Sequence, residues 1–151
     1  MIRGLTTISL AFAVAGTSLA VHAADTHTPE IACRVLLAPQ PIPTDPGYRI
    51  SIEEITIPPG HDGHEHDHAF TEYLHVVSGN GTLSVADKPD TPLAPDTIVV
   101  IPIKVPHQAH NASDTAPLIF TATFIENVKQ HVVTEYIGEP NKPHGCPHLQ
   151  K

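Results

Sequence analysis

The sequence lacks most features that would point to a helical or nucleic-acid-binding protein. Its 151 residues include no tryptophan, only two cysteines and eight lysines and arginines against sixteen aspartates and glutamates, which gives a formal net charge of −8. The basic residues form no cluster, so we expect neither nucleic acid nor an anionic membrane as a partner. Helix signals are scarce as well, because sixteen prolines are scattered over the chain and no stretch after residue 23 keeps apolar residues at helical spacing over three turns.

Residues 1–23 have the layout of a secretory signal peptide. Arg3 supplies a positive charge, an uncharged, alanine-rich run follows from Leu5 to Val21, and Val21-His22-Ala23 offers a cleavage site. A membrane anchor would need about 20 strongly apolar residues, whereas threonines, serines and a glycine dilute this run. We therefore expect residues 1–23 to be removed and the protein to be periplasmic or secreted.

The two cysteines, Cys33 and Cys146, allow a single intramolecular disulfide. An even cysteine count in an exported protein usually indicates such a bond. In the chain-entropy model, closing so long a loop contributes about 4–5 kcal/mol. The alternative is a second metal site in the C-terminal run His144-Gly145-Cys146-Pro147-His148, which offers three ligands and no fourth nearby. We predict the Cys33–Cys146 disulfide.

Strand patterns recur along the rest of the chain and predict an all-β fold. Candidate strands cover residues 48–52, 55–57, 71–77, 82–85, 98–101, 117–125 and 131–136. Glu53-Glu54 predicts a break between the first two strands. The turn Ser78-Gly79-Asn80-Gly81 predicts a hairpin between strands 71–77 and 82–85. The apolar run 98–101 predicts a buried strand. Many short strands at fairly regular spacing favour a sandwich or barrel.

We interpret residues 48–138 as one barrel, because no internal repeat suggests a second. The proline-containing residues 24–47 precede it as an extended arm, and residues 139–151 follow it as a C-terminal tail.

Histidines are unusually dense between His61 and His75, where five of the twelve lie. His66 and His68 are two residues apart, so on a strand both side chains leave the same face, and Glu72 keeps that parity. Two imidazoles and a carboxylate suit iron(II), manganese, nickel, copper or zinc. The absence of a cysteine among them argues against a closed structural zinc site. A lone His-x-His would be explained more simply by a solvated histidine-rich loop.

The complete spacing resembles the two motifs of the cupin superfamily. The first motif is matched by Gly60, five residues, His66-Asp67-His68, three residues, Glu72, six residues and Gly79. The second is matched by Asp96, five residues, Pro102, then Lys104, two residues, His107, three residues and Asn111. Asp96 and Lys104 stand where the family usually has glycine, and these departures concern local turns rather than the metal ligands.

The resemblance implies a single jelly-roll barrel, the double-stranded β-helix of cupins, with one divalent transition metal (iron, manganese, zinc, nickel or copper) inside its mouth. The implied ligands are His66, His68, Glu72 and His107, with one or two positions left open for oxygen, water or a small ligand. A homodimer through a barrel face or edge strand is a further expectation from the resemblance.

Parity along the candidate strands assigns the neighbouring side chains. Tyr73 and His75 have the opposite parity to Glu72 and should point away from the metal, as should His110 relative to His107. His64 could line the mouth, and Asn111 should be a turn residue. The outward acids Glu65 and Asp67 should meet solvent. We expect the interior to be lined by apolar residues of several strands: Leu74, Val76, Ile98, Val100 and Phe120.

Cupins include oxygenases, isomerases, decarboxylases, lyases, storage proteins and ligand-binding domains, so the fold does not choose among functions. The first hypothesis is an exported metal-dependent oxygenase acting on a small organic molecule, since no separate acid/base pair stands out. The second is a non-catalytic periplasmic protein that binds metal or a small ligand, which the many additional histidines favour.

Overall fold

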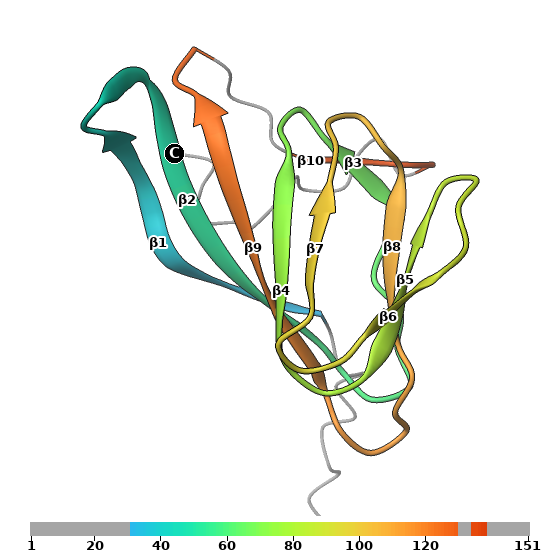
Figure 1. Cartoon of the computed structure of the whole chain (residues 1–151). Coiled ribbons are helices and arrows are strands. Elements are labelled where there is room, and N and C mark those ends of the chain that lie inside the picture. Colours follow the sequence, from blue (N-terminus) through green and yellow to red (C-terminus); the bar gives the residue numbers. More distant parts are fainter. Residues whose placement is uncertain (1–30, 130–133, 139–151) are drawn as a thin grey trace, which may run out of the picture.

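The computed structural model describes residues 31–129 and 134–138, and all regular structure in these residues is β-strand (Figure 1). The ten strands are β1 (Ala32–Ile42), β2 (Asp45–Ile57), β3 (His66–His68), β4 (Glu72–Ser78), β5 (Gly81–Val85), β6 (Thr91–Leu93), β7 (Ile98–Ile101), β8 (His107–Asn111), β9 (Leu118–Asn127) and β10 (Thr134–Tyr136).

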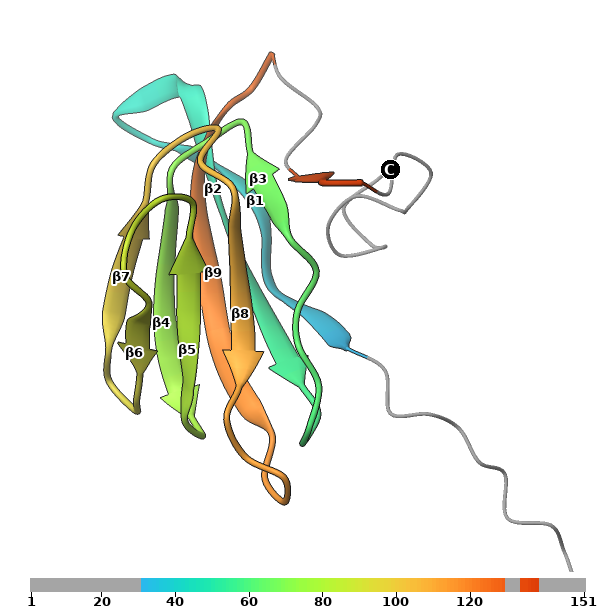
Figure 2. The same cartoon turned by 90° about the vertical axis from the view of Figure 1, so that its right-hand side faces the viewer.

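The strands form two five-stranded sheets in which neighbouring strands are antiparallel. One sheet has the order β1-β2-β9-β4-β7 and the other the order β10-β3-β8-β5-β6. Figure 2 shows the strands of the two sheets running roughly alongside one another, with β10 lying beside β3 at one end of the barrel. The all-β jelly-roll expected from the sequence is confirmed.

The core lies between the two sheets and follows the period-two alternation of the strands. In β9, Leu118, Phe120, Ala122 and Phe124 are all buried, while the residues between them are more exposed. Each large apolar side chain taken out of water in this way contributes about 1.5–3 kcal/mol. The interior position that we predicted for Phe120 is therefore confirmed.

The predicted hairpin between the strands on either side of Gly79 is wrong. β4 pairs with β7 and β9, whereas β5 pairs with β6 and β8 in the other sheet. The turn carries the chain from one sheet to the other at Gly79, whose φ of +87° favours glycine. A Cβ there would clash with the carbonyl oxygen of Pro117, so this crossing also requires the absence of a side chain.

The prediction that the apolar run of β7 is buried on both faces is wrong. Ile98 and Val100 are 67% and 55% exposed, whereas Ile101 is buried and Val99 packs partly against the core. The reason is that the sheet containing β7 is one of two layers, so only the face turned toward the other sheet meets the core, as in the neighbouring β4, where Tyr73 and Val77 are also exposed. Of the five residues expected to line the interior, Ile98 and Val100 therefore point outward.

The N-terminal sheet edge differs from the expectation in one respect. Residues 32–42 of the predicted arm are extended, as expected, and form β1, which pairs with β2. The break expected at Glu53-Glu54 is wrong, because β2 runs without interruption from Asp45 to Ile57 and pairs with β9 from Tyr48 to Ile57. Glu53 consequently lies on the inward face of a long strand.

Several predictions concern residues outside the described ranges. The signal peptide (residues 1–23), Cys146, the run from His144 to His148 and the start of the last predicted strand (residues 131–133) all fall there. The export signal, the Cys33–Cys146 disulfide and the alternative metal site stay predictions. The described part of the chain contains no helix that is long and apolar enough to cross a membrane.

Candidate metal centre

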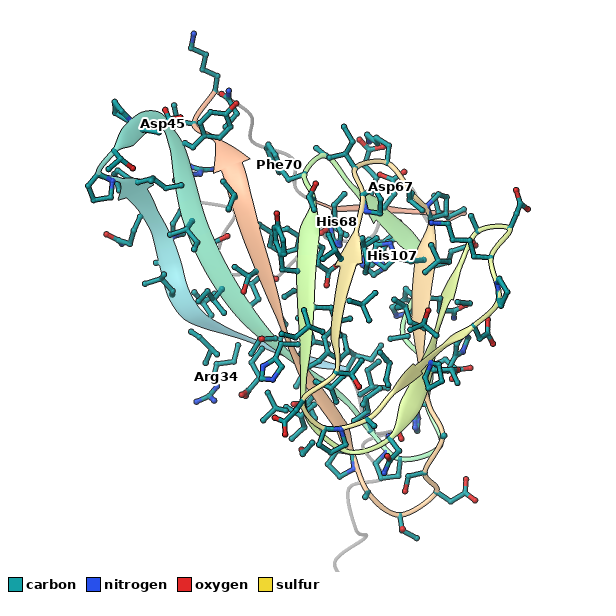
Figure 3. All side chains as sticks on the ribbon, viewed as in Figure 1. Arg34, Asp45, Asp67, His68, Phe70 and His107 are labelled. Carbon is teal, nitrogen blue, oxygen red and sulfur yellow. The ribbon has the colours of Figure 1, made fainter. Side chains whose placement is uncertain are left out.

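The four residues that the motifs single out converge at one end of the space between the sheets. His66 and His68 come from β3, Glu72 begins β4 and His107 begins β8. One ligand atom from each lies within 4.8 Å of the others, and among the described residues this is the one group of three or more such side chains. His66 is directly paired with His107 across β3 and β8. Figure 3 shows His68 and His107 close together near β3.

Each histidine of the group is held through its Nδ1 atom, which leaves Nε2 for a metal ion. His66 Nδ1 lies 2.7 Å from the carbonyl oxygen of His64, and His107 Nδ1 lies 2.9 Å from that of Val105. A carbonyl oxygen accepts only, so both Nδ1 atoms donate. His68 Nδ1 lies 3.1 Å from Thr134 Oγ1. Such outer partners fix the tautomer and the orientation of metal-binding histidines in proteins.

The spacing around Glu72 fits adjacent ligands of one ion. Glu72 Oε2 lies 3.0 Å from His68 Nε2 and 3.2 Å from His107 Nε2. Two atoms that are each about 2.1 Å from a shared ion, at about a right angle, would be about 3.0 Å apart. The donor set and its geometry therefore fit a divalent transition metal.

The charge states of the group suit metal binding. Burial, together with the neighbouring His107 and His68, lowers the pKa of His66 from 6.5 to about 4, so its imidazole is neutral at pH 7. Burial would raise the pKa of Glu72, but hydrogen bonds from His107 and His68 outweigh this effect and hold the pKa below its usual range. Glu72 is therefore a carboxylate at neutral pH.

His107 behaves differently because it faces that carboxylate. Burial lowers its pKa, but the hydrogen bond and the charge of Glu72 outweigh burial and raise the pKa above the ordinary value of 6.5. A metal ion must displace a proton from any imidazole that carries one on the ligating nitrogen, and metal binding is for this reason coupled to pH.

A cavity of about 110 Å³ opens beside the histidines. His66 and His68 line it on one side, together with His64, Thr134 and Tyr136. The wall formed by the other sheet comes from β1, β2, β4 and β9: Cys33, Glu53, Ile55, Ile57, Glu72, Phe120, Ala122 and Phe124. An ion held by the four residues would therefore have its remaining positions beside a largely apolar space, as in small-molecule sites generally.

Among the residues that line this cavity, sequence reasoning missed three with hydrogen-bonding side chains: Glu53, Thr134 and Tyr136. Thr134 and Tyr136 reach it from β10, opposite His68 and His66 in the strand register. Glu53 reaches it from β2 and is only 5% exposed. A usable signal existed for Glu53, because it shares the parity of Ile55 and Ile57 once the strand is read as continuous. No local signal linked β10 to β3, which lies more than 60 residues earlier.

The outward assignments hold for the residues flanking the group. Tyr73 and His75 lie on the face of β4 opposite to that of Glu72. Tyr73 is 41% exposed, and His75 Nε2 lies 3.8 Å from Oδ1 of the exposed Asp96. His110 contacts Ser84 and Asp62 on the outer face of β8. His64, which we expected near the mouth, does line the cavity.

Asn111 was predicted to be a turn residue, but it is the last residue of β8 and its side chain is buried. Its Nδ2 atom lies 3.0 Å from each of the carbonyl oxygens of Ile57, Pro58 and Ala116, and its Oδ1 atom accepts a hydrogen bond from the backbone N–H of Ser113. The side chain therefore ties the end of β8 to the end of β2.

Asp67 was predicted to point outward and meet solvent, but its side chain is largely covered. Its side chain is 13% exposed and accepts a hydrogen bond from Lys104 Nζ at 3.2 Å, and Lys104 also pairs with Glu135 at 2.9 Å. Lys104 thus joins the turn before β8 to β3 and β10.

Both positions where the family usually has glycine keep a glycine-like backbone. The φ angles of Asp96 and Lys104 are +67° and +56°. The turns of the second motif are therefore preserved. Both residues have a left-handed backbone conformation, which costs most residues other than glycine about 1–2 kcal/mol.

Comparisons with known proteins agree with this geometry. Residues 53–124 match the family model of the cupin domain. No curated protein sequence matches the chain. Among solved structures, the fold is similar to a cupin-like protein from Thermotoga maritima, with 22% identity, a TM-score of 0.58 and coverage of 74% of this chain and 78% of that one.

Two enzymes are also similar in fold. The DMSP lyase DddQ from Ruegeria pomeroyi has 16% identity and a TM-score of 0.57 over 75% of this chain and 54% of that chain. An oxalate decarboxylase of Bacillus subtilis has 18% identity and a TM-score of 0.50 over 60% of this chain and 28% of that chain. This chain therefore spans about half of the lyase and a smaller part of the decarboxylase.

These observations define an all-β barrel with a histidine- and glutamate-lined centre that could hold a metal ion. The chain carries a domain of the cupin superfamily.

Proposed function

We propose that this protein is an exported cupin metalloprotein that holds one divalent transition metal through His66, His68, Glu72 and His107. We propose further that it is an oxygenase acting on a small organic molecule. The convergence of the four ligand atoms beside a largely apolar cavity carries this proposal. The chain would bind the ion with neutral imidazoles and one carboxylate, and the ion would supply Lewis-acid or redox chemistry to a ligand in the cavity.

The protein's own groups would orient both partners of the reaction. The Nδ1 hydrogen bonds of His66, His68 and His107 fix the imidazoles, and the apolar side chains of β9 keep bulk water away from the ligand. The preference for an oxygenase began with the lack of a separate acid/base group in the sequence. Glu53, a buried carboxylate in the cavity, removes that argument, so oxygen chemistry needs its own test.

The alternative is a non-catalytic periplasmic protein that binds metal or a small ligand. Histidines outside the candidate centre favour it, among them His61, His75 and His110. Metal identity separates the two functions: purified native protein with redox-active iron or manganese and substrate-dependent oxygen uptake supports the oxygenase. Several equivalents of zinc or copper without oxygen uptake would contradict it and support the binding protein.

The assignment of the ligands is tested by His107→Ala with His75→Ala as its control. Loss of a buried ligand nitrogen should reduce bound metal at least about tenfold, because ligand geometry sets metal affinity, whereas His75 lies on the outer face and its variant should keep wild-type content. Metal is measured by atomic emission in dialysed protein. Normal metal in the His107 variant, or loss in the His75 variant, would show that inward and outward faces are misassigned.

We also propose that the partners are a small molecule and a second copy of this chain. The outer face of β4 and β7 exposes Tyr73, Val77, Ile98 and Val100, and Tyr73 stands directly opposite Val100 in the register. An exposed apolar face beside an unpaired strand edge is typical of contact surfaces. Light scattering should give a dimer mass that Val100→Lys shifts toward the monomer, and a monomeric wild-type protein would contradict the dimer.

A further inference from the structure

A serine, a histidine and an aspartate lie in line on the outer face of the sheet that contains β5 and β8. Ser84 Oγ in β5 lies 3.0 Å from His110 Nε2 in β8, and His110 Nδ1 lies 3.2 Å from Asp62 Oδ1. The backbone holds the three residues side by side, because β5 pairs with β8 and Asp62 forms an isolated bridge with His110. Figure 2 shows β5 and β8 next to each other.

This cluster lies on the opposite face of β8 from the candidate metal centre. His107 is buried on the inner face of β8, whereas His110 has the opposite parity and its side chain is 31% exposed. Ser84 likewise is partly exposed between the buried Leu83 and Val85. A reagent in solution can therefore reach the cluster without entering the cavity beside the metal centre.

The two distances give each group of the cluster a role. A carboxylate only accepts hydrogen bonds, so His110 carries its proton on Nδ1, toward Asp62, and has a lone pair on Nε2. The Ser84 hydroxyl then donates to Nε2, since the other acceptor near it, the carbonyl oxygen of Gln108, is more distant at 3.3 Å. A hydroxyl beside an imidazole base that a third group orients is the arrangement of an activated nucleophile.

We propose that Ser84 is a nucleophile that takes up acyl groups from activated esters, with His110 as its general base and Asp62 as the group that orients His110. In this step Ser84 Oγ forms a bond to the carbonyl carbon and the bond from that carbon to the leaving oxygen breaks. The Ser84 proton passes to His110 Nε2 and from there to the leaving oxygen. This activity needs no metal ion and goes beyond the proposed function.

The position of Ser84 in the sheet restricts the substrate to esters with a good leaving group. Backbone N–H groups of a strand lie in the plane of its sheet, where β5 pairs with β8 on one side and β6 on the other. They are therefore not directed at an oxyanion above Ser84 Oγ. Loss of one such donor costs serine hydrolases about 10²–10³ in rate, so the leaving group has to supply the reactivity.

Covalent labelling with an alkyl fluorophosphonate tests the proposal, because attack of a serine Oγ on phosphorus releases fluoride and leaves a stable phosphonate ester. Peptide mass spectrometry of the purified protein gives the labelling rates of Ser84 and Ser113 in one sample. Ser113 is an internal reference, since it is also partly exposed but its Oγ accepts hydrogen bonds from the backbone N–H groups of Thr115 and Ala116. Ser84 should react at least about tenfold faster, because a positioned general base accelerates such steps.

Substitutions separate the roles of the other two groups. His110→Gln should lower the Ser84 rate to that of Ser113, because an amide cannot take the proton. Asp62→Asn should lower it by at least about threefold, less than for a buried aspartate, because water screens a carboxylate that is 57% exposed. His75→Gln is the matched control, since His75 also lies beside an aspartate, Asp96, on an outer face, and its variant should label Ser84 at the wild-type rate.

Equal labelling of Ser84 and Ser113 in the wild-type protein would overturn the proposal. An unchanged Ser84 rate in His110→Gln would overturn it as well, with circular dichroism showing that the variant is folded and His110→Asn as the second variant if it is not. Zinc-loaded and zinc-free protein should label Ser84 equally, and a rate that depends on zinc would contradict the role of His110. Absence of zinc binding would contradict the proposed function alone and leave this test intact.

Discussion

At the residue scale, two of the candidate ligands are positioned by the same local device. His66 and His107 each direct Nδ1 to the carbonyl oxygen two residues earlier in the chain. Because the partner is so near in sequence, the orientation of the imidazole is encoded within each motif. His68 differs, since its partner Thr134 comes from β10, and its orientation therefore depends on the pairing of β10 with β3.

The left-handed backbone at Asp96 leads to a prediction about stability. Its φ is +67° and its side chain is 98% exposed, so the side chain contributes little packing while the backbone is strained. Asp96→Gly should relieve that strain, but glycine also has greater conformational entropy in the unfolded chain. The net effect should be an increase of about 0.5–1 kcal/mol in the free energy of unfolding. Urea unfolding measures the gain as a higher midpoint at an unchanged slope.

Asp90→Gly is the control for this substitution. Asp90 is also an exposed aspartate in a loop, but it is not among the residues with positive φ. Glycine there brings only its entropic cost, so the midpoint should stay the same or fall. Equal shifts for both variants would show that the backbone at Asp96 is not strained.

At the element scale, the pairing of β2 with β9 includes a buried ion pair. Arg49 stands opposite Glu126 in the register, and its Nη2 atom lies 2.8 Å from Glu126 Oε2. Glu126 is 1% exposed and also accepts a hydrogen bond from Ser51 Oγ at 2.6 Å. The carboxylate is thus satisfied from one strand only.

Arg49→Met should destabilise the protein by about 3 kcal/mol or more, because it leaves the Glu126 carboxylate buried without its cation. The measurement is the free energy of unfolding in urea at neutral pH, by circular dichroism. Arg34→Met provides the matched comparison, since Arg34 also stands opposite a glutamate on the neighbouring strand, Glu54, at 2.8 Å, but its side chain is 68% exposed. The exposed Arg34–Glu54 pair should contribute at most about 1 kcal/mol to the free energy of unfolding. Similar losses in both variants would contradict the difference in burial.

The sequence predicts individual strands and the ligand set better than it predicts pairing. Strand identity and inward parity follow from local alternation, as in β9, and the ligand spacing is local within each motif. Pairing and layering are decided by the whole barrel. The turn at Gly79 is typical of a hairpin but connects two sheets, and the apolar run of β7 is typical of a buried strand but has one face on the outside of the barrel. Glu53 was missed for a related reason, since an acidic pair reads as a break until the partner strand β9 is known.

At the scale of the whole molecule, the two sheets have different tasks. The sheet containing β3, β8 and β10 supplies the three imidazoles of the candidate centre, and the sheet containing β2, β4 and β9 supplies Glu72, Glu53 and the apolar wall. The cavity therefore exists only when the sheets face each other, so unfolding should release any bound metal together with loss of the barrel. Metal should correspondingly raise the unfolding midpoint of the protein by mass action.

The cellular location of the molecule is a proposal that rests on its N-terminal sequence. We propose that the chain is exported, that cleavage follows Ala23 and that the mature protein carries the Cys33–Cys146 disulfide, because Arg3, the apolar run and Val21-His22-Ala23 have the layout of a signal peptide. An oxidising compartment would allow the bond to form.

Expression of the full chain in a bacterium with a periplasm tests this proposal. Intact mass spectrometry of the periplasmic fraction should give the mass of a chain that begins at about Ala24. The same sample should gain no mass with a thiol-alkylating reagent until a reductant is added. Protein that keeps residues 1–23, or that is alkylated at both cysteines without reductant, would contradict the corresponding part of the proposal.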